Sequence, residues 1–314
     1  TVYACRVRIL KKVERVGGAR AKKAINHQQR QKTAQIISEL RLEHALPDLL
    51  TIAELSRSTY YYHQQRLTEP NKDQLLCDDI GHLFNEHNAC YGYRRMTFIL
   101  KQLGYLVNKK KVQRLMQLLR LKAVIRAPKK YRSYRGKEGR IAPNILMRKF
   151  DCEEPNHKWV TDVTEFRVGD EKLYLSPVLD LFNRQIIAYQ LMRKPVYKLV
   201  SDMLEKAIST LKSTEKPLIH SDQGWQYQLD SYQQTLASHG FTQSMSRKGN
   251  CLDNAVIESF FGTLKCELFY REKFTSIEQL EKRIHEYIYY YNHERVSTKL
   301  KGLSPVQYRN QSSL

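Results

Sequence analysis

The sequence predicts an all-α first half followed by a mixed α/β domain. Apolar residues recur at helical spacing through residues 33–125, and strand and helix patterns alternate from residue 156 to 293. The charge also divides the chain. Residues 1–150 contain 32 Lys and Arg against 11 Asp and Glu, whereas residues 151–314 contain 21 of each. The whole net charge of +21 therefore lies in the predicted helical half.

The composition limits the class of protein. A chain of 314 residues with 41% hydrophobic residues can bury the cores of two or three domains. No apolar run is long enough to predict a membrane span. The six cysteines form no Cys-x-x-Cys pair, so we interpret them as free thiols in a reducing cytoplasm and not as zinc ligands. The chain starts at Thr1 without Met, which leads us to expect a fragment, a processed form or part of a longer fused product.

The concentrated positive charge predicts a polyphosphate partner, because each neutralised phosphate releases counterions. We expect double-stranded DNA, with an RNA-binding or merely soluble basic domain as the alternative. A basic arm, residues 1–32, precedes the first predicted helical unit, residues 33–68. Pro47 is suited to a first helical turn, and Ser56 can cap the helix that carries Tyr60.

Two short helices joined by a tight turn are typical of a DNA-binding helix-turn-helix, although a small helical bundle has the same pattern. We expect Arg57, Ser58 and Thr59 at the start of the second helix, where they would contact DNA.

A second helix-turn-helix-like unit is predicted over residues 71–125. Asn108 ends a turn and can cap the next helix, which has one apolar and one basic side. A merely solvated charged face is the alternative for that basic side. The DNA contacts expected from this unit are Arg94, Arg95, Lys109, Lys110, Lys111 and Arg114.

Residues 126–150 form a basic linker that contains a single acid, Glu138. We expect it to lie along DNA and to order on contact, with a flexible tether as the alternative. The contacts expected here are Lys129, Lys130, Arg132 and Arg135.

The second half predicts a five-stranded mixed sheet with helices, of the α+β or α/β class. Strands over 160–166, 173–181 and 185–192 have short connections, which indicates an antiparallel meander. A helix over 197–211, a strand over 218–220, a helix over 230–239, a strand over 241–245 and a helix over 254–268 follow. A further helix over 277–291 leads into the tail. We expect a catalytic core over 151–275 and a C-terminal helix and tail over 276–314.

Three carboxylates stand on three of these elements. Asp162 lies in the middle of the first predicted strand, where a carboxylate is costly unless it is paired or binds a cation. Asp222 directly follows a short buried strand, and Glu258 lies on a helix. Converging carboxylates can hold two Mg²⁺ or Mn²⁺ ions, one activating the attacking hydroxyl and one stabilising the leaving oxygen. Three acids alone, however, are a weak signal in a chain that has 32 of them.

The spacing and surroundings of these acids are more specific. Fifty-nine residues separate Asp162 from Asp222, and 35 separate Asp222 from Glu258. This spacing resembles that of retroviral-type integrases and bacterial insertion-sequence transposases. The surrounding strings are similar to those of the insertion-sequence-three family over residues 33–310. They include Trp-Val-Thr-Asp-Val-Thr at 159–164, His-Ser-Asp-Gln-Gly-Trp at 220–225, Asp-Asn-Ala-Val-Ile-Glu at 253–258 and Tyr-Gly-Tyr-Arg-Arg at 91–95.

The resemblance implies an RNase H-like core in which Asp162, Asp222 and Glu258 are catalytic metal ligands. It implies that Lys265 is the basic residue facing DNA and that residues 246–254 form a mobile active-site loop, from which we expect Arg247 and Lys248 to contact DNA. It further implies a transposase that binds terminal inverted repeats, cleaves strands at the 3′ ends and transfers them. Such a protein acts as a homo-oligomer on transposon-end and target DNA in the bacterial nucleoid, without a small-molecule substrate.

Two other functions remain open from the sequence. A DNA-binding regulator with a dormant core would keep the basic half but could lose any of the acids, and this chain keeps all three. A nuclease for RNA–DNA hybrids would have little need of two helix-turn-helix units. For His220 and for the tyrosines at 287, 289, 290 and 291, packing is the expected role.

Overall fold

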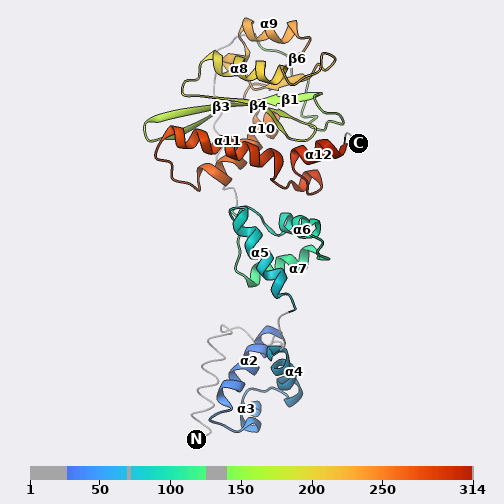
Figure 1. The fold of residues 1–314 in the computed structure, drawn as a ribbon, viewed down its shortest axis with the longest axis vertical. Coiled ribbons are helices and arrows are strands. Elements are labelled where there is room, and N and C mark those ends of the chain that lie inside the picture. Colours follow the sequence, from blue (N-terminus) through green and yellow to red (C-terminus); the bar gives the residue numbers. More distant parts are fainter. Residues whose placement is uncertain (1–26, 69–71, 125–139, 313–314) are drawn as a thin grey trace. The chain divides into compact units, whose positions relative to one another are not determined.

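The computed structural model describes residues 27–68, 72–124 and 140–312 (Figure 1). The chain divides into two compact units between Asp78 and Asp79. None of the described helices has the length and apolar character needed to cross a lipid bilayer.

Among the described residues of the first unit, three helices precede α5 (Gln74–Glu86): α2 (His27–Leu40), α3 (Leu46–Ile52) and α4 (Arg57–Thr68). Pro47 stands in the first turn of α3, where its missing N–H has no helical partner to lose. The Ser56 hydroxyl accepts a hydrogen bond from the Thr59 N–H at 3.2 Å and so caps the start of α4. Ile37, Leu49 and Tyr60 bring one apolar side of each helix into a common core. The predicted short helices are therefore confirmed.

The next three helices are α5 (Gln74–Glu86), α6 (Tyr93–Gln102) and α7 (Lys109–Leu118). The predicted cap of α7 is confirmed, because the Asn108 side chain accepts a hydrogen bond from the Lys111 N–H at 2.8 Å. Met96 and Leu100 of α6 are buried, as are Val112 and Leu115 of α7.

Within the second unit, the segment around α6 packs against the C-terminal part of the chain. The hydroxyl of Tyr91 accepts a hydrogen bond from the Val296 N–H at 2.8 Å, and both residues are buried. Gly302 lies against the ring of Phe98, where an added Cβ would approach ring atoms to within 2.3 Å. Gly302 also has a φ of +91°, so both contact and backbone conformation require glycine there.

A six-stranded sheet forms the centre of the second unit. Its strands are β1 (Lys158–Thr161), β2 (Thr164–Val168), β3 (Glu171–Asp180), β4 (Ile186–Met192), β5 (Leu218–Ser221) and β6 (Thr242–Met245). Strand β3 pairs antiparallel with β1, β2 and β4, which confirms the predicted meander. Strands β1, β5 and β6 are parallel neighbours. This mixed order brings the carboxyl ends of β1 and β5 together.

The prediction of one continuous strand over residues 160–166 is wrong, and so is the expected count of five strands. Strands β1 and β2 follow one edge of β3 in a single register, with Thr161 opposite Val178 and Thr164 opposite Leu175. This register places Pro177 opposite Asp162. Because proline has no N–H to donate, the ladder is interrupted there and one expected strand becomes two. Asp162 consequently stands in the break between β1 and β2 along one side of β3, and not in mid-strand.

Helices cover both faces of the sheet (Figure 1). Helices α8 (Tyr197–Ile208) and α9 (Asp230–Ser238) pack on one face around Trp159 and Ile219. Helices α10 (Ala255–Leu264) and α11 (Ile277–His293) pack on the other around Val160 and Leu175. Short 3₁₀ helices lie at Trp225–Tyr227, Cys251–Asn254 and Thr298–Leu300, and α12 (Pro305–Ser312) closes the described chain.

The helix predicted over residues 254–268 is regular only as far as Leu264. A π-helical turn, Lys265–Phe269, follows it, with the Tyr270 N–H bonded to the Lys265 carbonyl at 2.9 Å. Such turns persist where side-chain contacts compensate for the poorer backbone geometry. Here the Glu267 carboxylate accepts two hydrogen bonds from Arg295, both at 2.7 Å, so a buried ion pair accompanies the irregular turn.

Candidate active site

Asp162 and Asp222 occupy equivalent places at the ends of two neighbouring parallel strands. Val160 of β1 is in register with His220 of β5, and each aspartate follows two residues later. The carboxyl ends of adjacent parallel strands are where such sheets present functional side chains. The sheet therefore brings together two acids that are 59 residues apart in the sequence.

Each aspartate is held by a backbone N–H of its own loop. The Asp162 carboxylate accepts a hydrogen bond from the Val163 N–H at 2.7 Å, and that of Asp222 accepts one from the Gly224 N–H at 2.8 Å. A Cβ on Gly224 would lie 2.6 Å from the Gln226 side-chain amide and 2.9 Å from the Asp222 carboxylate, so a larger residue here would displace these side chains.

The two carboxyl groups are electrostatically strained. Burial raises the pKa of Asp162 well above its usual range, and the nearby charges of Asp222 and Glu258 raise it further. Burial also raises the pKa of Asp222. Neighbouring like charges disfavour ionisation unless a cation offsets them. Asp222 and Glu258 are thus each close enough to Asp162 to influence its charge.

Glu258 lies on α10, and Lys265 follows it at the beginning of the π-helical turn. The Lys265 ammonium donates to the Thr164 hydroxyl at 2.7 Å and to the Glu165 carbonyl at 3.0 Å. Its positive charge lowers the pKa of Asp162 against the larger effect of burial. Lys265 therefore joins the end of α10 to β2 beside Asp162.

The donor set suits a hard divalent cation. Within residues 27–68, 72–124 and 140–312, no three His, Cys, Asp or Glu side chains are grouped as a metal site. Asn254 nevertheless donates to the Thr161 carbonyl at 3.1 Å, next to Asp162, while its own buried Oδ1 has no hydrogen-bond partner. An orphaned oxygen beside mutually repelling carboxylates fits Mg²⁺ or Mn²⁺ chemistry.

The loop between β6 and α10 is fastened by Asp253, whose side chain is 0% exposed. Its carboxylate accepts hydrogen bonds from the backbone and guanidinium of Arg247, from Arg148 at 2.7 Å and from Asn144 at 2.9 Å. These bonds hold the pKa of Asp253 below its usual range, and the bond from the Arg247 side chain contributes most. Because Glu258 lies five residues further on, this anchor fixes the start of its helix.

His220 lies beneath the two aspartates as a packed residue, as predicted. Its ring nitrogens lie 2.9 Å from the Ser244 hydroxyl and 3.1 Å from the Ser246 hydroxyl. Burial lowers its pKa to about 4. Of the four tyrosines for which packing was predicted, Tyr287 and Tyr291 are buried, whereas Tyr289 is 60% exposed. Tyr290 is partly buried, and its hydroxyl lies 3.2 Å from that of Tyr91.

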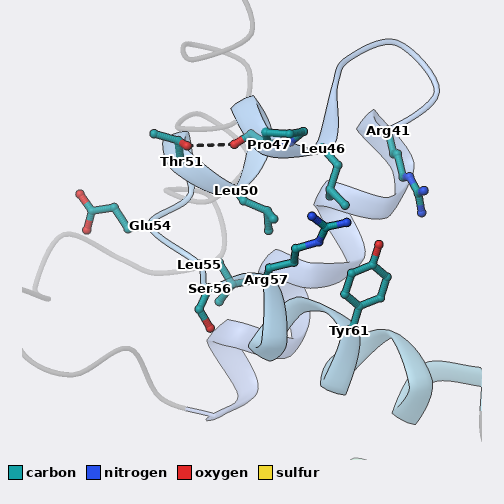
Figure 2. Close-up of a pocket in the computed structure, with 10 residues that line it drawn as sticks. All are labelled: Arg41, Leu46, Pro47, Leu50, Thr51, Glu54, Leu55, Ser56, Arg57 and Tyr61. Atoms are coloured by element: carbon teal, nitrogen blue, oxygen red, sulfur yellow. Dashed lines mark hydrogen bonds between the residues drawn. The ribbon is translucent and has the colours of Figure 1, made fainter.

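In the first unit, the residues predicted to meet DNA stand at the exposed start of α4. Arg57, Ser58 and Thr59 are its first three residues, and Arg57 and Ser58 are exposed. Figure 2 shows Arg57 and Tyr61 at a cavity of about 620 Å³, with Leu46 and Leu50 lining it from α3. The Arg57 guanidinium carbon lies 5.8 Å from the centre of the Tyr61 ring.

In the second unit, the predicted DNA contacts divide into exposed and engaged residues. Arg95 donates to the Cys90 carbonyl at 3.3 Å and to the Glu267 carboxylate at 3.2 Å, so its guanidinium has partners inside the chain. Lys265 is half-buried and donates to Thr164 and Glu165, and Arg247 is exposed but its guanidinium is bonded to Asp253. The other predicted residues in this part are exposed except Lys111, which is half-buried: Arg94, Lys109, Lys110, Lys111, Arg114 and Lys248. Lys129, Lys130, Arg132 and Arg135 lie outside the described residues, as do residues 1–26 of the basic arm.

Sequence reasoning missed Asp253, Glu267 and Arg295 as determinants of the site's architecture. An Asx pair directly before a helix, Asp253-Asn254, was an available signal for the first. Glu267 and Arg295 are 28 residues apart in unrelated patterns, and their pairing depends on the π-helical turn. No sequence pattern identified that pair.

Comparisons with known proteins agree with this arrangement. The chain matches the family models described as "Integrase core domain" over residues 153–251 and 258–313, and "HTH-like domain" over residues 70–129. It is 52% identical over 278 residues to the putative transposase InsK for insertion sequence element IS150 of Escherichia coli, which is 88% of this chain and 98% of that protein.

A second curated relative and one solved structure are also similar to this chain. Transposase InsF for insertion sequence IS3A of Escherichia coli is 32% identical over 283 residues, 88% of this chain and 98% of that protein. The HTLV-2 integrase catalytic core, solved in complex with magnesium, is 22% identical with a TM-score of 0.40, over 49% of this chain and 97% of that chain. From its two curated relatives, the chain belongs to the insertion-sequence-three family of transposases, with an HTH-like domain and an RNase H-like integrase core.

Proposed function

We propose that Asp162, Asp222 and Glu258 hold two divalent cations, Mg²⁺ or Mn²⁺, and that this centre cleaves and joins DNA strands. The observation that carries the proposal is the pair of aspartates at register-equivalent strand ends, each with a raised pKa. Buried like charges without a counter-ion are costly, and a bound cation would remove that cost. Glu258 would complete the ligand set by turning its side chain toward the aspartates.

The reaction has two steps of the same chemistry. In the first, water attacks a phosphodiester at an end of the element, a P–O bond forms, and the P–O3′ bond breaks to free a 3′-hydroxyl. In the second, that 3′-hydroxyl attacks a phosphodiester of another strand, whose own 3′ oxygen leaves. When bound, the cations would activate the attacking hydroxyl and stabilise the leaving oxygen. The chain's own carboxylates would orient these groups, and Asn254 would hold α10 against β1.

DNA binding is the part of the proposal that falls on the helical units. The start of α4 with Arg57, Ser58 and Thr59 has the form of a recognition-helix N-terminus. Helix α7 presents basic residues outward from a buried apolar side, and Arg94, Arg247 and Lys248 add exposed positive charge. We propose that these residues bind the element's terminal inverted repeats and target DNA, with several copies assembled on the DNA in the bacterial nucleoid.

The test is strand cleavage and joining on labelled DNA that carries the two ends of the source element. Reactions contain Mg²⁺, Mn²⁺ or a chelator. We expect nicks at the 3′ ends and joined products only when a metal is present. End binding without metal-dependent cutting would contradict the proposal and favour a regulatory protein with a dormant core. Cutting of RNA–DNA hybrids in preference to element ends would favour a hybrid nuclease.

A further inference from the structure

A second cationic cavity lies in the same unit as the triad. It has a volume of about 410 Å³ and is lined by residues of α6, the β3–β4 turn, α10, α11 and the tail. We call it the tail pocket. Its four charged lining residues are Arg95, Arg184, Arg295 and Lys299, and no Asp or Glu among the described residues lines it. The chain has thus gathered four positive charges from distant segments around one cavity.

Carboxylates outside the described lining of the cavity balance only part of this charge. Glu267 accepts hydrogen bonds from Arg295 at 2.7 Å and from Arg95 at 3.2 Å, so one carboxylate serves two guanidiniums. Arg184 and Lys299 add two further charges. Asp151 and Asp180 act on Arg184 from outside the lining, so the excess of positive charge lies at the cavity surface itself. Such an excess around a cavity concentrates anions.

Arg184 is held at the pocket in an unusual way. It occupies the β3–β4 turn with a φ of +63°, a conformation that non-glycine residues rarely adopt. Its Nη2 donates to the Phe150 carbonyl at 3.4 Å, whereas its buried Nη1 has no hydrogen-bond partner. Burial lowers its pKa, and the charges of Asp151 and Asp180 raise it by less. A partly buried, incompletely satisfied guanidinium would be stabilised by a nearby anion.

The pocket lies on a different side of α10 from the triad. Ser259 and Thr263 line it, and they stand roughly 100–140° around the helix from Glu258, since each residue advances an α-helix by about 100°. Their hydroxyls, with those of Ser297 and Thr298, add hydrogen-bonding groups to the cations. Phe260 and Leu300 supply an apolar part of the lining.

We propose that the tail pocket binds a backbone phosphate of DNA, at a nucleotide other than the one being cut. The proposal rests on the proposed function, because it gives the same transposition complex a second DNA contact. A phosphodiester has several acceptor oxygens, which suits guanidiniums, an ammonium and hydroxyls converging from separate elements. The apolar lining suits the attached deoxyribose. A carboxylate side chain would use fewer of these donors.

The test compares binding of a duplex carrying one element end, in chelator, by the full chain and by variants. The altered variants are Arg184→Met and Lys299→Gln, alone and together. Lys282→Gln is the matched control, because Lys282 is an exposed lysine of α11 that does not line the pocket. We expect the double variant to bind about three- to tenfold more weakly and to lower the salt slope of log K by about 0.9, the value of one lost phosphate contact. The control should change neither quantity.

A single neutral methylphosphonate, moved along each strand, then locates the contact. At one position it should weaken binding by the wild-type chain but not by the double variant. If every position weakens both proteins equally, or the double variant matches Lys282→Gln, the proposal is wrong. Unchanged DNA binding with an altered sedimentation coefficient would also overturn it, in favour of an acidic segment from a second copy.

Two controls keep these results interpretable. If Arg184→Met does not fold, Lys299→Gln alone repeats the measurement, because Lys299 is exposed. Cleavage is assayed separately with metal. If no pocket contact is found while cleavage is retained, this inference alone is wrong. If the contact is mapped but no cleavage occurs, only the proposed catalysis is wrong.

Discussion

Two pairs of carboxylates in the same unit have opposite surroundings. Asp253 and Glu267 are buried, each is bonded to two arginines, and their pKa values lie below the usual range. Asp162 and Asp222 each accept one backbone hydrogen bond from their own loop, and their pKa values lie above that range. The first pair holds the architecture together. The ionised forms of the second pair lower the stability of the fold, which indicates that a positively charged ligand from outside the chain would bind them.

This contrast also separates two roles for basic residues. Arg95, predicted as a DNA contact, lies beside Glu267 with its side chain 24% exposed. On α7, Lys109 and Lys110 are exposed around a buried apolar side. The total charge therefore indicates a polyanionic partner, but only the fold shows which basic residues already form ion pairs within the chain.

The largest effect is expected at the three acids of the triad, Asp162, Asp222 and Glu258. Asp162→Asn, Asp222→Asn and Glu258→Gln should each reduce strand cleavage by about 10³-fold or more, because each removes several kcal/mol of transition-state stabilisation. DNA binding in chelator should stay within about twofold of wild type. Cleavage and binding are measured on the same labelled element-end DNA.

The control for the triad variants is Asp170→Asn. Asp170 is exposed, and its side chain is paired with Arg167 at 3.4 Å. It should leave cleavage unchanged. Cleavage close to wild type by any triad variant would remove the distinction between the two pairs of acids.

The second effect concerns the stability of a paired acid. Glu267→Gln leaves Arg295, which is 8% exposed, without its carboxylate. Breaking a buried ion pair on one side costs about 3–5 kcal/mol of unfolding free energy. Urea unfolding measures this directly. Glu171→Gln, which breaks an exposed pair with Arg193, should cost less than about 1 kcal/mol. Equal costs for the two variants would mean that Glu267 is not a structural anchor.

A smaller effect is expected at Asp253. Its partners Arg148 and Arg247 are 40% and 60% exposed, so water can replace part of what Asp253→Asn removes. We expect a loss of about 1–2 kcal/mol. Amide hydrogen exchange should accelerate within residues 246–254 and the start of α10, and cleavage should fall while DNA binding persists. Unchanged exchange in this loop would show that Asp253 does not fix the approach to Glu258.

Much of this site was predictable from the sequence, because its acids follow strand and helix patterns that can be read locally. Asp222 was correctly placed at a strand end, and Glu258 on a helix. Asp162 was assigned to the correct segment but to the middle of one strand. The strand breaks at Asp162 because Pro177 lies opposite it, and that position of Pro177 is set only by the pairing with β3.

The ion pairs of Glu267 with Arg295 and Arg95 were not predictable for a related reason. Arg295 approaches Glu267 through a π-helical turn and a tail segment, and neither has a periodic pattern. Arg95 joins them from a segment 172 residues away in the chain. A pattern within one helix or strand carries information about its own faces, whereas these contacts are set by packing between elements.

The smallest effect is a pH dependence that distinguishes the two pairs further. The hydrogen bonds and charges of Arg295 and Arg95 keep the pKa of Glu267 below its usual value despite burial. A lowered folded-state pKa contributes stability above the unfolded value, about 4.3, and this contribution is lost as pH falls through the folded pKa. The difference in unfolding free energy between wild type and Glu267→Gln should therefore be constant from pH 7 to about 5. Below that it should shrink by no more than about 1.4 kcal/mol per pH unit. Other titrating groups are common to both proteins and largely cancel in the difference. Urea unfolding from pH 7 to 3.5 tests this. A difference that widens toward low pH would mean that burial outweighs the arginines, and Glu267 would then resemble Asp162 and Asp222.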